Sequence, residues 1–226
     1  YCNGSEPYQD LGVRNVSHRY KWPKKGKPLE LPEWFGVDQL SGSSFQRNVQ
    51  LKKLGPRLWN TIDHRKLADW IVSDWGGIRG NKQQTIDAFV SRIDSGDLPK
   101  ELKGVATYSK IVALVFPEDF CIYDARVAVS LNCIQMLDSH RRPGYFFPYL
   151  PSRNTKINAF IKKANKLAFL RSGWKQIDPD MSYTTYNELL SELCHEHGIE
   201  TKFLLEMSLF IDCEDLIALV DILDGA

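Results

Sequence analysis

The sequence predicts an all-α protein, and three observations support this prediction. Apolar residues recur at intervals of three and four, as on the buried face of a helix, most clearly over 86–93 and 157–168. Strong helix breakers separate these stretches, among them the glycine-rich loop 75–81. No segment shows the polar–apolar alternation of a half-buried strand. We expect two helical lobes with a cleft between them, and no sheet of four or more strands.

The chain is expected to form one domain over 1–226, with an N-terminal arm and two helical parts. Residues 1–40 are rich in Pro, Gly and aromatic residues, and Pro23 and Pro28 exclude a regular helix in its basic stretch. We expect this arm to be a strap over the core, because the apolar side chains of Trp34 and Phe35 follow; a DNA-contacting arm is the alternative. One lobe is expected over 41–140, and the C-terminal helices over 155–226.

Caps and breakers define the first helices. Ser43 or Ser44 is expected to cap a helix that runs to about residue 54, where Gly55-Pro56 stops it. Asp63 opens the next helix, and the stripe over 86–93 forms another.

The following helices lead to and from a glycine turn at Gly104. A short helix is expected over 98–102 and a longer one over 107–116. Asp124 then begins a long helix whose inner face carries Val127, Leu131 and Ile134. A loop over 141–154, a helix over 157–168 and two or three helices between 182 and 223 complete the expected fold.

The composition fits a soluble protein with a sizeable core. Hydrophobic residues make up 43% of the chain, and no stretch approaches the ~18 apolar residues of a membrane span. The five scattered cysteines lack C-x-x-C spacing, so we expect free thiols in a reducing, cytoplasmic compartment. On a helix, His195 and His197 would point about 200° apart, so we expect no metal site beside Cys194.

Charge is unevenly distributed along the chain, although the net charge is only +1. Residues 141–177 contain nine Lys or Arg and no acidic residue, whereas residues 178–226 contain twelve Asp or Glu and one Lys. The basic block either faces nucleic-acid phosphates or is neutralised by the acidic block across a lobe interface. In the first case Arg141, Arg142, Lys162 and Lys163 are candidate DNA contacts.

The most informative segment reads LKGVATYSKIVA over 102–113, followed by IYDARV over 122–127. It resembles the signature of the helix-hairpin-helix DNA glycosylases, a Leu-Pro-Gly-Val-Gly hairpin followed by a helix, a loop and an Asp that opens a new helix. The Ser-Lys pair and the second segment look closest to bacterial proteins of the 8-oxoguanine-glycosylase fold. The motifs cover about residues 75–135, and the rest of the chain matches only as helices.

The resemblance implies a monomeric enzyme, without cofactor or metal, that excises a modified or damaged base from double-stranded DNA. The role would be repair or phage defence, since one bacterial enzyme of this kind removes glucosylated hydroxymethylcytosine from phage DNA. Such an enzyme must extrude the nucleotide, because the stack shields the glycosidic bond. Backbone N–H groups of the hairpin at Gly104, Ala106 and Thr107 would hold a phosphate. Asp124, at a helix N-terminus, would stabilise the positive charge that develops on the sugar.

The chain departs from the family signature at several positions. Lys103 replaces the proline, Ala106 replaces the second glycine and weakens the phosphate cradle, and the cysteine spacing of the family's iron–sulfur cluster is absent. Alignment on Gly104 places Tyr108 where bifunctional members have a nucleophilic lysine, which favours simple hydrolysis. Lys110 faces the opposite side of the helix and is the alternative nucleophile.

Each catalytic candidate also has a structural interpretation. Asp124 could be only a helix cap, Tyr108 a core residue, and Lys110 a solvated lysine or a phosphate contact. The rival functions are an inactive DNA-binding or interaction module of the same fold and a helical domain with an accidental motif match.

The remaining candidates concern DNA contact. Arg126 is expected to grip a phosphate or to pair with an acidic residue at 118 or 119. Tyr145, Phe146 and Phe147 are expected to line the base pocket or wedge into the DNA, with a hydrophobic plug as the alternative.

Overall fold

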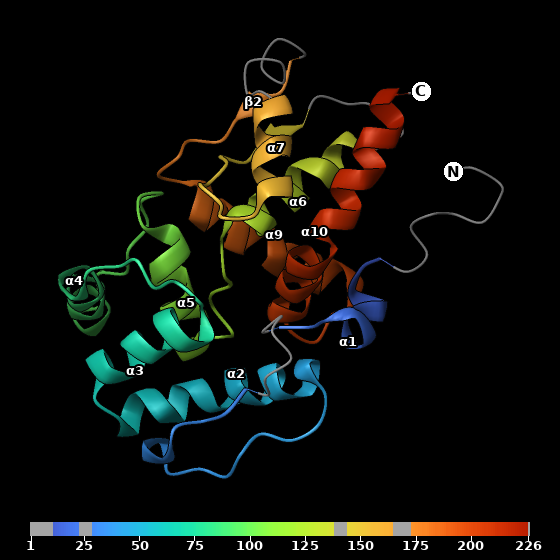
Figure 1. Ribbon diagram of the computed structural model, residues 1–226. Helices are drawn as coiled ribbons and strands as arrows, with labels where there is room; N and C mark the ends of the chain where they lie inside the picture. The colour runs from blue at the N-terminus through green and yellow to red at the C-terminus, as the bar shows by residue number, and fades with distance from the viewer. Residues whose placement is uncertain (1–10, 23–28, 138–143, 165–172, 226) are drawn as a thin grey trace.

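A computed structural model describes residues 11–22, 29–137, 144–164 and 173–225, and helices dominate it (Figure 1). Within this described part, the only strands are β1 (Tyr145–Phe146) and β2 (Lys175–Gln176), which pair in parallel. For these residues the expected all-α class is confirmed, and they form no larger sheet. None of the described helices combines the length and the apolar character needed to cross a bilayer.

The helices pack in two groups, which Figure 1 shows at lower left and upper right. In the first group α2 packs along α5, and α3 lies against α4; in the second, α10 packs along α6. The first group consists of α2 (Ser44–Thr61), α3 (His64–Trp70), the π-helix η3 (Ile71–Trp75), α4 (Gln83–Asp94) and α5 (Val105–Val115). The second consists of α1 (Val16–Arg19), α6 (Ala125–Met136), α7 (Thr155–Lys163), α9 (Ser182–His197) and α10 (Lys202–Gly225).

The placement of α6 differs from the expected division at residue 140. Although α6 lies within 41–140, its main partner is α10. Helix α1 contacts both α2 and α10, so the N-terminal segment joins the two groups.

Three expected caps form, and each is a local hydrogen bond. Ser43 and Gln46 make a reciprocal capping box at the start of α2. The Asp63 side chain accepts from the Lys66 N–H at the start of α3, and Asp124 caps α6. The apolar stripe of α4 is buried, as its spacing predicts.

The expected end of α2 at Gly55-Pro56 is wrong, because the helix continues to Thr61. Pro56 costs α2 one backbone hydrogen bond. At Gly55 the two helices touch closely: a Cβ built there would lie 1.7 Å from the carbonyl oxygen of Leu114 in α5. The missing side chain lets α2 and α5 approach at backbone distance, and this tertiary contact outweighs the local breaker signal.

Two further expectations near the motif are wrong. Residues 98–102 contain no helix, so the turn at Gly104 follows a bend rather than a helix. Arg92 instead holds this segment by pairing with Glu101. On α6, Val127 and Leu131 are buried, but Ile134 is 48% exposed.

The C-terminal elements agree with their apolar spacing where the structure describes them. Helix α7 covers the first part of the 157–168 stripe, whose remainder after 164 lies outside the described residues. Between 182 and 223 the chain forms two helices, α9 and α10.

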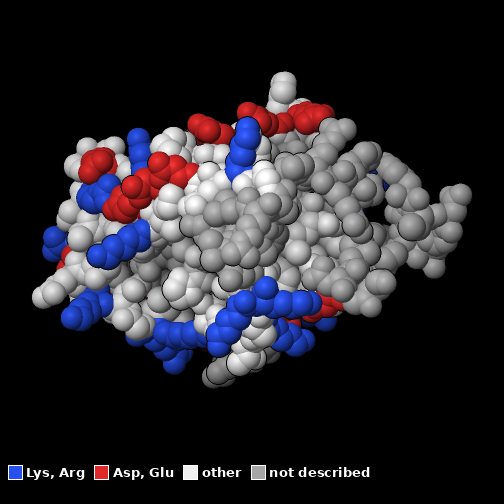
Figure 2. Space-filling model, turned by 90° about the horizontal axis from the view of Figure 1, so that it is seen from above, with Lys and Arg blue, Asp and Glu red and all other residues white. Residues whose placement is uncertain are grey.

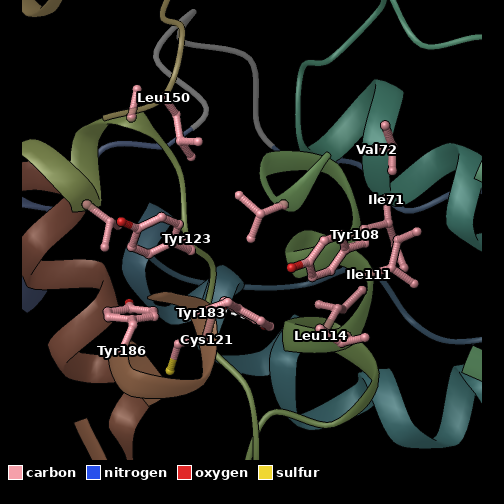
Figure 3. Packing of buried hydrophobic residues seen from close by; sticks show 14 of the residues in the cluster. Ile71, Val72, Tyr108, Ile111, Leu114, Cys121, Tyr123, Leu150, Tyr183 and Tyr186 are labelled. Atoms are coloured by element: carbon pink, nitrogen blue, oxygen red, sulfur yellow. Dashed lines mark hydrogen bonds between the residues drawn. The ribbon is translucent and has the colours of Figure 1, made fainter. Parts of the chain in front are cut away.

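One hydrophobic core extends through both groups of helices, and tyrosines connect its parts (Figure 3). The Tyr183 ring lies edge-on to Tyr108 at 5.4 Å, and Tyr123 contacts Tyr186 at 5.3 Å. The Tyr183 hydroxyl donates to the Cys121 carbonyl oxygen and the Tyr123 hydroxyl to that of Pro148, which satisfies these buried donors.

The described part of the arm packs onto the helices. Leu29, Leu31 and Phe35 are buried in the main core, and the half-buried Trp34 lies under the Lys66 ammonium. Earlier in the arm, Tyr20 joins a second buried cluster with α10. The arm therefore bridges the main core and the cluster around Tyr20.

Candidate functional site

A pocket of about 370 Å³ lies where the two groups of helices meet. Its volume falls in the ~300–1,000 Å³ range of small-molecule sites. The first group contributes the turn after η3 and the first turns of α5, and the second contributes the start of α6, the loop 151–154 and α10. Tyr20 and Trp22 of the arm also line the pocket. Six separate segments thus converge on one cavity.

Lys110 and Asp124 face each other in this pocket. The distance from Lys110 Nζ to Asp124 Oδ2 is 4.0 Å, and the two side chains are 9% and 18% exposed. Lys110 Nζ also donates to the Ala106 carbonyl oxygen at 2.9 Å, which fixes the ammonium beside the first turn of α5. A solvated surface lysine is therefore excluded as a description of Lys110.

Burial lowers the pKa of Lys110 below its ordinary value. The nearby carboxylates of Asp124 and Glu206 oppose this effect, and the Lys52 ammonium adds to it. A lysine with a lowered pKa is more often a neutral amine, which is the nucleophilic form. The Lys110 amine and the Asp124 carboxylate therefore lie close enough for both to contact one carbon atom placed beside them in the pocket.

The two oxygens of Asp124 have different partners. Oδ1 accepts from the backbone N–H groups of Arg126 and Val127 at 2.9 and 3.2 Å, so it caps α6. Oδ2 faces Lys110. Asp124 is therefore a helix cap and, through its second oxygen, a charge in the pocket.

Aromatic rings form one wall of the pocket. Trp22 lies edge-on to Phe210 with 5.4 Å between ring centres, and Tyr20 lies 6.3 Å from the same ring. The Trp22 indole N–H donates to the Trp75 carbonyl oxygen, which links the arm to η3. Burial and then the charges of Glu206 and Asp124 raise the pKa of Tyr20, so its hydroxyl stays protonated at neutral pH.

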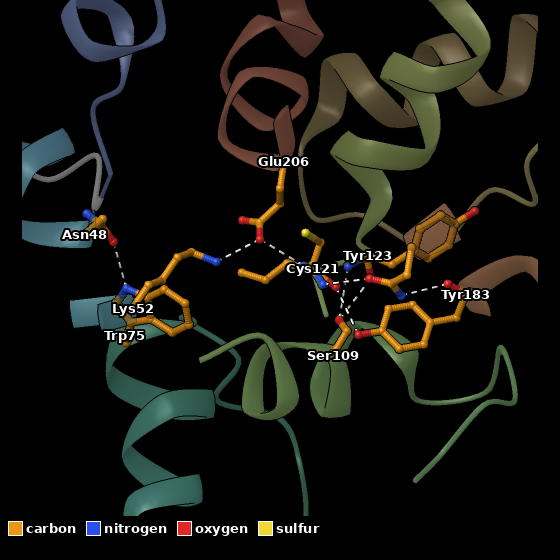
Figure 4. Close-up of polar contacts among 10 residues, drawn as sticks. Asn48, Lys52, Trp75, Ser109, Cys121, Tyr123, Tyr183 and Glu206 are labelled. Carbon is orange, nitrogen blue, oxygen red and sulfur yellow. Dashed lines mark hydrogen bonds and ion pairs between the residues drawn. The ribbon is translucent and has the colours of Figure 1, made fainter. Parts of the chain in front are cut away.

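A buried ion pair connects α2 to α10 at the edge of the pocket (Figure 4). Lys52 Nζ lies 2.8 Å from Glu206 Oε2, and the side chains are 1% and 4% exposed. The backbone N–H of Ile122 donates to the same oxygen at 3.0 Å. Glu206 lines the pocket. Sequence reasoning missed this pair and Trp75; a lysine and a glutamate inside otherwise apolar helix faces were the available signal.

Arg126 lines the pocket but is already partnered. Its guanidinium bonds Glu214 at 2.9 Å and lies over the Phe210 ring at 5.1 Å. The expected pairing with residues 118 or 119 is wrong, because α6 packs along α10 and brings Glu214 to Arg126. Asn154 donates to the same Glu214 oxygen and holds the loop 151–154 in place.

Tyr108 lies outside the pocket lining. Its ring is fully buried between Phe89 and Tyr183, and its hydroxyl donates to the Glu101 carbonyl oxygen at 2.8 Å. Burial raises the pKa of Tyr108 well above its usual range. Tyr108 and Lys110 point to opposite sides of α5, as their spacing predicts, and of the two only Lys110 lines the pocket.

The aromatic loop also differs from expectation. Phe146 and Phe147 are buried, and the backbone of Phe147 exchanges two hydrogen bonds with the Asn132 side chain. Tyr145 is 55% exposed, but none of the three residues lines the pocket. The burial of Phe146 and Phe147 fits the alternative of a hydrophobic plug.

The expected hairpin residues surround the start of α5. Gly104 has φ +81°, and a Cβ there would lie 2.7 Å from the Phe89 ring, so this position requires glycine. Ala106 lies inside the helix and lines the pocket with Thr107. The Thr107 hydroxyl accepts from Asn81 at 2.8 Å.

The basic block is partly neutralised by α10. Lys163 pairs with Asp221 at 2.7 Å, and Lys156 lies 3.5 Å from Glu214. Lys162 is exposed, while Arg141 and Arg142 lie outside the described residues. Figure 2 shows Lys and Arg side chains gathered along one edge of the face seen from above, and Asp and Glu mainly along the opposite edge.

Comparison with known proteins identifies no relative of this chain. No family model matches it, and no curated protein or solved structure matches it either.

Proposed function

We propose that this protein is a DNA glycosylase that extrudes a modified or damaged nucleotide and excises its base. The observation that supports this most directly is the Lys110–Asp124 pair, 4.0 Å apart in a pocket with aromatic walls. Amine and carboxylate suit the two demands of the reaction, attack on the sugar carbon and stabilisation of the positive charge that forms there. Aromatic rings suit the flat base, which loses its stacking partners on extrusion.

In the proposed reaction the neutral Lys110 amine attacks C1′ of the extruded nucleotide. The Nζ–C1′ bond forms while the C1′–N bond to the base breaks, and the base leaves with the electrons of that bond. The amine proton passes to Asp124 Oδ2 and from there to the departing base. Opening of the sugar ring then gives a Schiff base, which hydrolysis converts to an abasic site and free Lys110. We favour this route over direct attack by water because Lys110, and not Tyr108, lines the pocket.

The test is a panel of duplexes that each carry one modified base, including oxidised, alkylated, deaminated and glucosylated bases. Abasic sites are detected as strand breaks after alkali. Borohydride is expected to trap a covalent protein–DNA adduct with the wild-type chain and none with Lys110→Met. Lys103→Ala is the control, because Lys103 is an exposed lysine beside the same turn and should trap normally.

Other outcomes point to other functions. Abasic sites without a trapped adduct would replace the amine by a water nucleophile held by Asp124. Salt-dependent duplex binding without any abasic site would favour an inactive DNA-binding module. If the chain neither binds nor excises a base from any duplex of the panel, the proposal is refuted.

A further inference from the structure

Among the described residues, hydrogen bonds to the Glu206 carboxylate reach only one of its two oxygens. Both donors that contact this side chain, Lys52 Nζ and the Ile122 N–H, reach Oε2. In Figure 4 the dashed lines from Glu206 end on this one oxygen. Among the described residues, none donates to Oε1, although the side chain is only 4% exposed. Because Oε1 is not fully enclosed by the protein, a donor bound in the pocket can reach it.

The surroundings indicate what kind of partner fits. Glu206 shares the pocket with the aromatic rings of Trp22, Trp75 and Phe210, which offer flat apolar contact. Carboxylates accept hydrogen bonds only, so the matching edge must donate. In nucleobases, a carboxylate pairs with an exocyclic amino group such as N4 of cytosine or N6 of adenine.

We propose that Glu206 selects bases with an exocyclic amino group, by accepting a hydrogen bond from that group at Oε1. The proposal rests on the proposed glycosylase function and narrows its substrate class. Lys52 and the Ile122 N–H orient the carboxylate by holding Oε2, so Oε1 is fixed in direction before the base arrives. A base with a carbonyl group in the same place would set two acceptors against each other and would be rejected.

This arrangement makes Glu206→Gln an unusually direct test. Lys52 and the Ile122 N–H are both donors, so the amide oxygen of the new side chain must take the position of Oε2. The amide NH₂ group then replaces Oε1 and turns the acceptor into a donor. The preference should therefore move from the amino-bearing base to the carbonyl-bearing base, while both buried donors stay paired.

The experiment compares bases in matched pairs that exchange an amino group for a carbonyl, cytosine with uracil types and adenine with hypoxanthine. Excision from duplexes is measured as kcat/KM, and binding of the free nucleosides by quenching of tryptophan fluorescence. We expect the wild-type chain to favour the amino member roughly tenfold or more, and Glu206→Gln to abolish or reverse this preference. Glu188→Gln is the control, since it makes the same change at an exposed glutamate of α9 outside the pocket lining and should keep the wild-type preference.

The possible results separate this proposal from the proposed function. Excision with no amino preference, or with a preference that Glu206→Gln leaves unchanged, would overturn the role of Glu206 and leave the glycosylase function intact. Without excision, an amino preference in nucleoside binding that Glu206→Gln reverses would still support base recognition and would refute only the chemistry. Equal slowing of both members of each pair would assign Glu206 a structural role and overturn the proposal.

Discussion

Replacing Asp124 by asparagine separates its two roles, because each belongs to a different oxygen. Oδ1 caps α6, and Oδ2 lies 4.0 Å from Lys110 Nζ. Asparagine keeps the capping oxygen and is about as good an N-cap as aspartate. We therefore expect Asp124→Asn to fold, with a free energy of unfolding within about 1 kcal/mol of the wild type.

The effect on the reaction should be much larger. Two opposite charges 4 Å apart attract by about 4 kcal/mol at an effective dielectric constant of 20, and a sugar cation attached to Lys110 would lie at a similar distance from Oδ2. Loss of a preorganised charge of this kind typically costs ~10²–10³ in rate, about 3–4 kcal/mol. The two figures agree, so we expect turnover to fall by two to three orders of magnitude. DNA affinity should persist or increase, because a carboxylate repels phosphates.

The pH dependence of the reaction should change together with its rate. Asp124 raises the pKa of Lys110 against the lowering effect of burial. Removing its charge lowers that pKa further, so the amine is neutral from a lower pH upward. In Asp124→Asn, the acidic limb of the profile of kcat/KM against pH should shift to lower pH while the plateau falls.

The assay is single-turnover excision of the best duplex from the panel, with melting temperature and DNA affinity measured on the same preparations. Asp63→Asn is the matched control, because Asp63 is also an N-cap whose side chain accepts a backbone N–H, but outside the pocket lining. Its activity should equal that of the wild type. Full activity of Asp124→Asn would refute the electrostatic argument, and a collapsed melting temperature would reduce Asp124 to a structural cap.

Three further predictions test the fold and the DNA contact. Tyr108→Phe removes the hydroxyl that bonds the Glu101 carbonyl oxygen and should cost about 1 kcal/mol of stability with full excision activity; inactivity at an unchanged melting temperature would return Tyr108 to the chemistry. Gly55→Ala should cost about 3 kcal/mol or more in urea denaturation, since its Cβ would meet the Leu114 carbonyl oxygen. The exposed neighbour Lys53→Ala is its control, and a loss below ~1 kcal/mol would contradict the close approach of α2 to α5. Lys162→Glu should weaken duplex binding and flatten the salt slope by roughly one, with a smaller effect for Lys163→Glu, whose lysine already pairs with Asp221; unchanged affinity would assign this face to solvent.

Local sequence patterns determined the helical class and several helix starts. Ser43, Asp63 and Asp124 cap helices through hydrogen bonds to N–H groups two or three residues away, so the necessary information lies within one turn. The opposite directions of Tyr108 and Lys110 also follow from helical periodicity alone. The sequence thus placed Asp124 at a helix start and put Lys110 on a face free of the core stripe.

Only the tertiary structure decided where these faces meet. Helix α2 runs through Pro56 because Gly55 lets it touch the backbone of α5, a contact between residues almost sixty positions apart. The same is true of the pocket, since Trp22, Lys110, Asp124 and Glu206 come from four segments with no spacing in common. A local pattern tells which side of a helix is apolar. The partner of that side depends on long-range packing, which here brings Lys110 to Asp124 and turns Glu206 toward the same cavity.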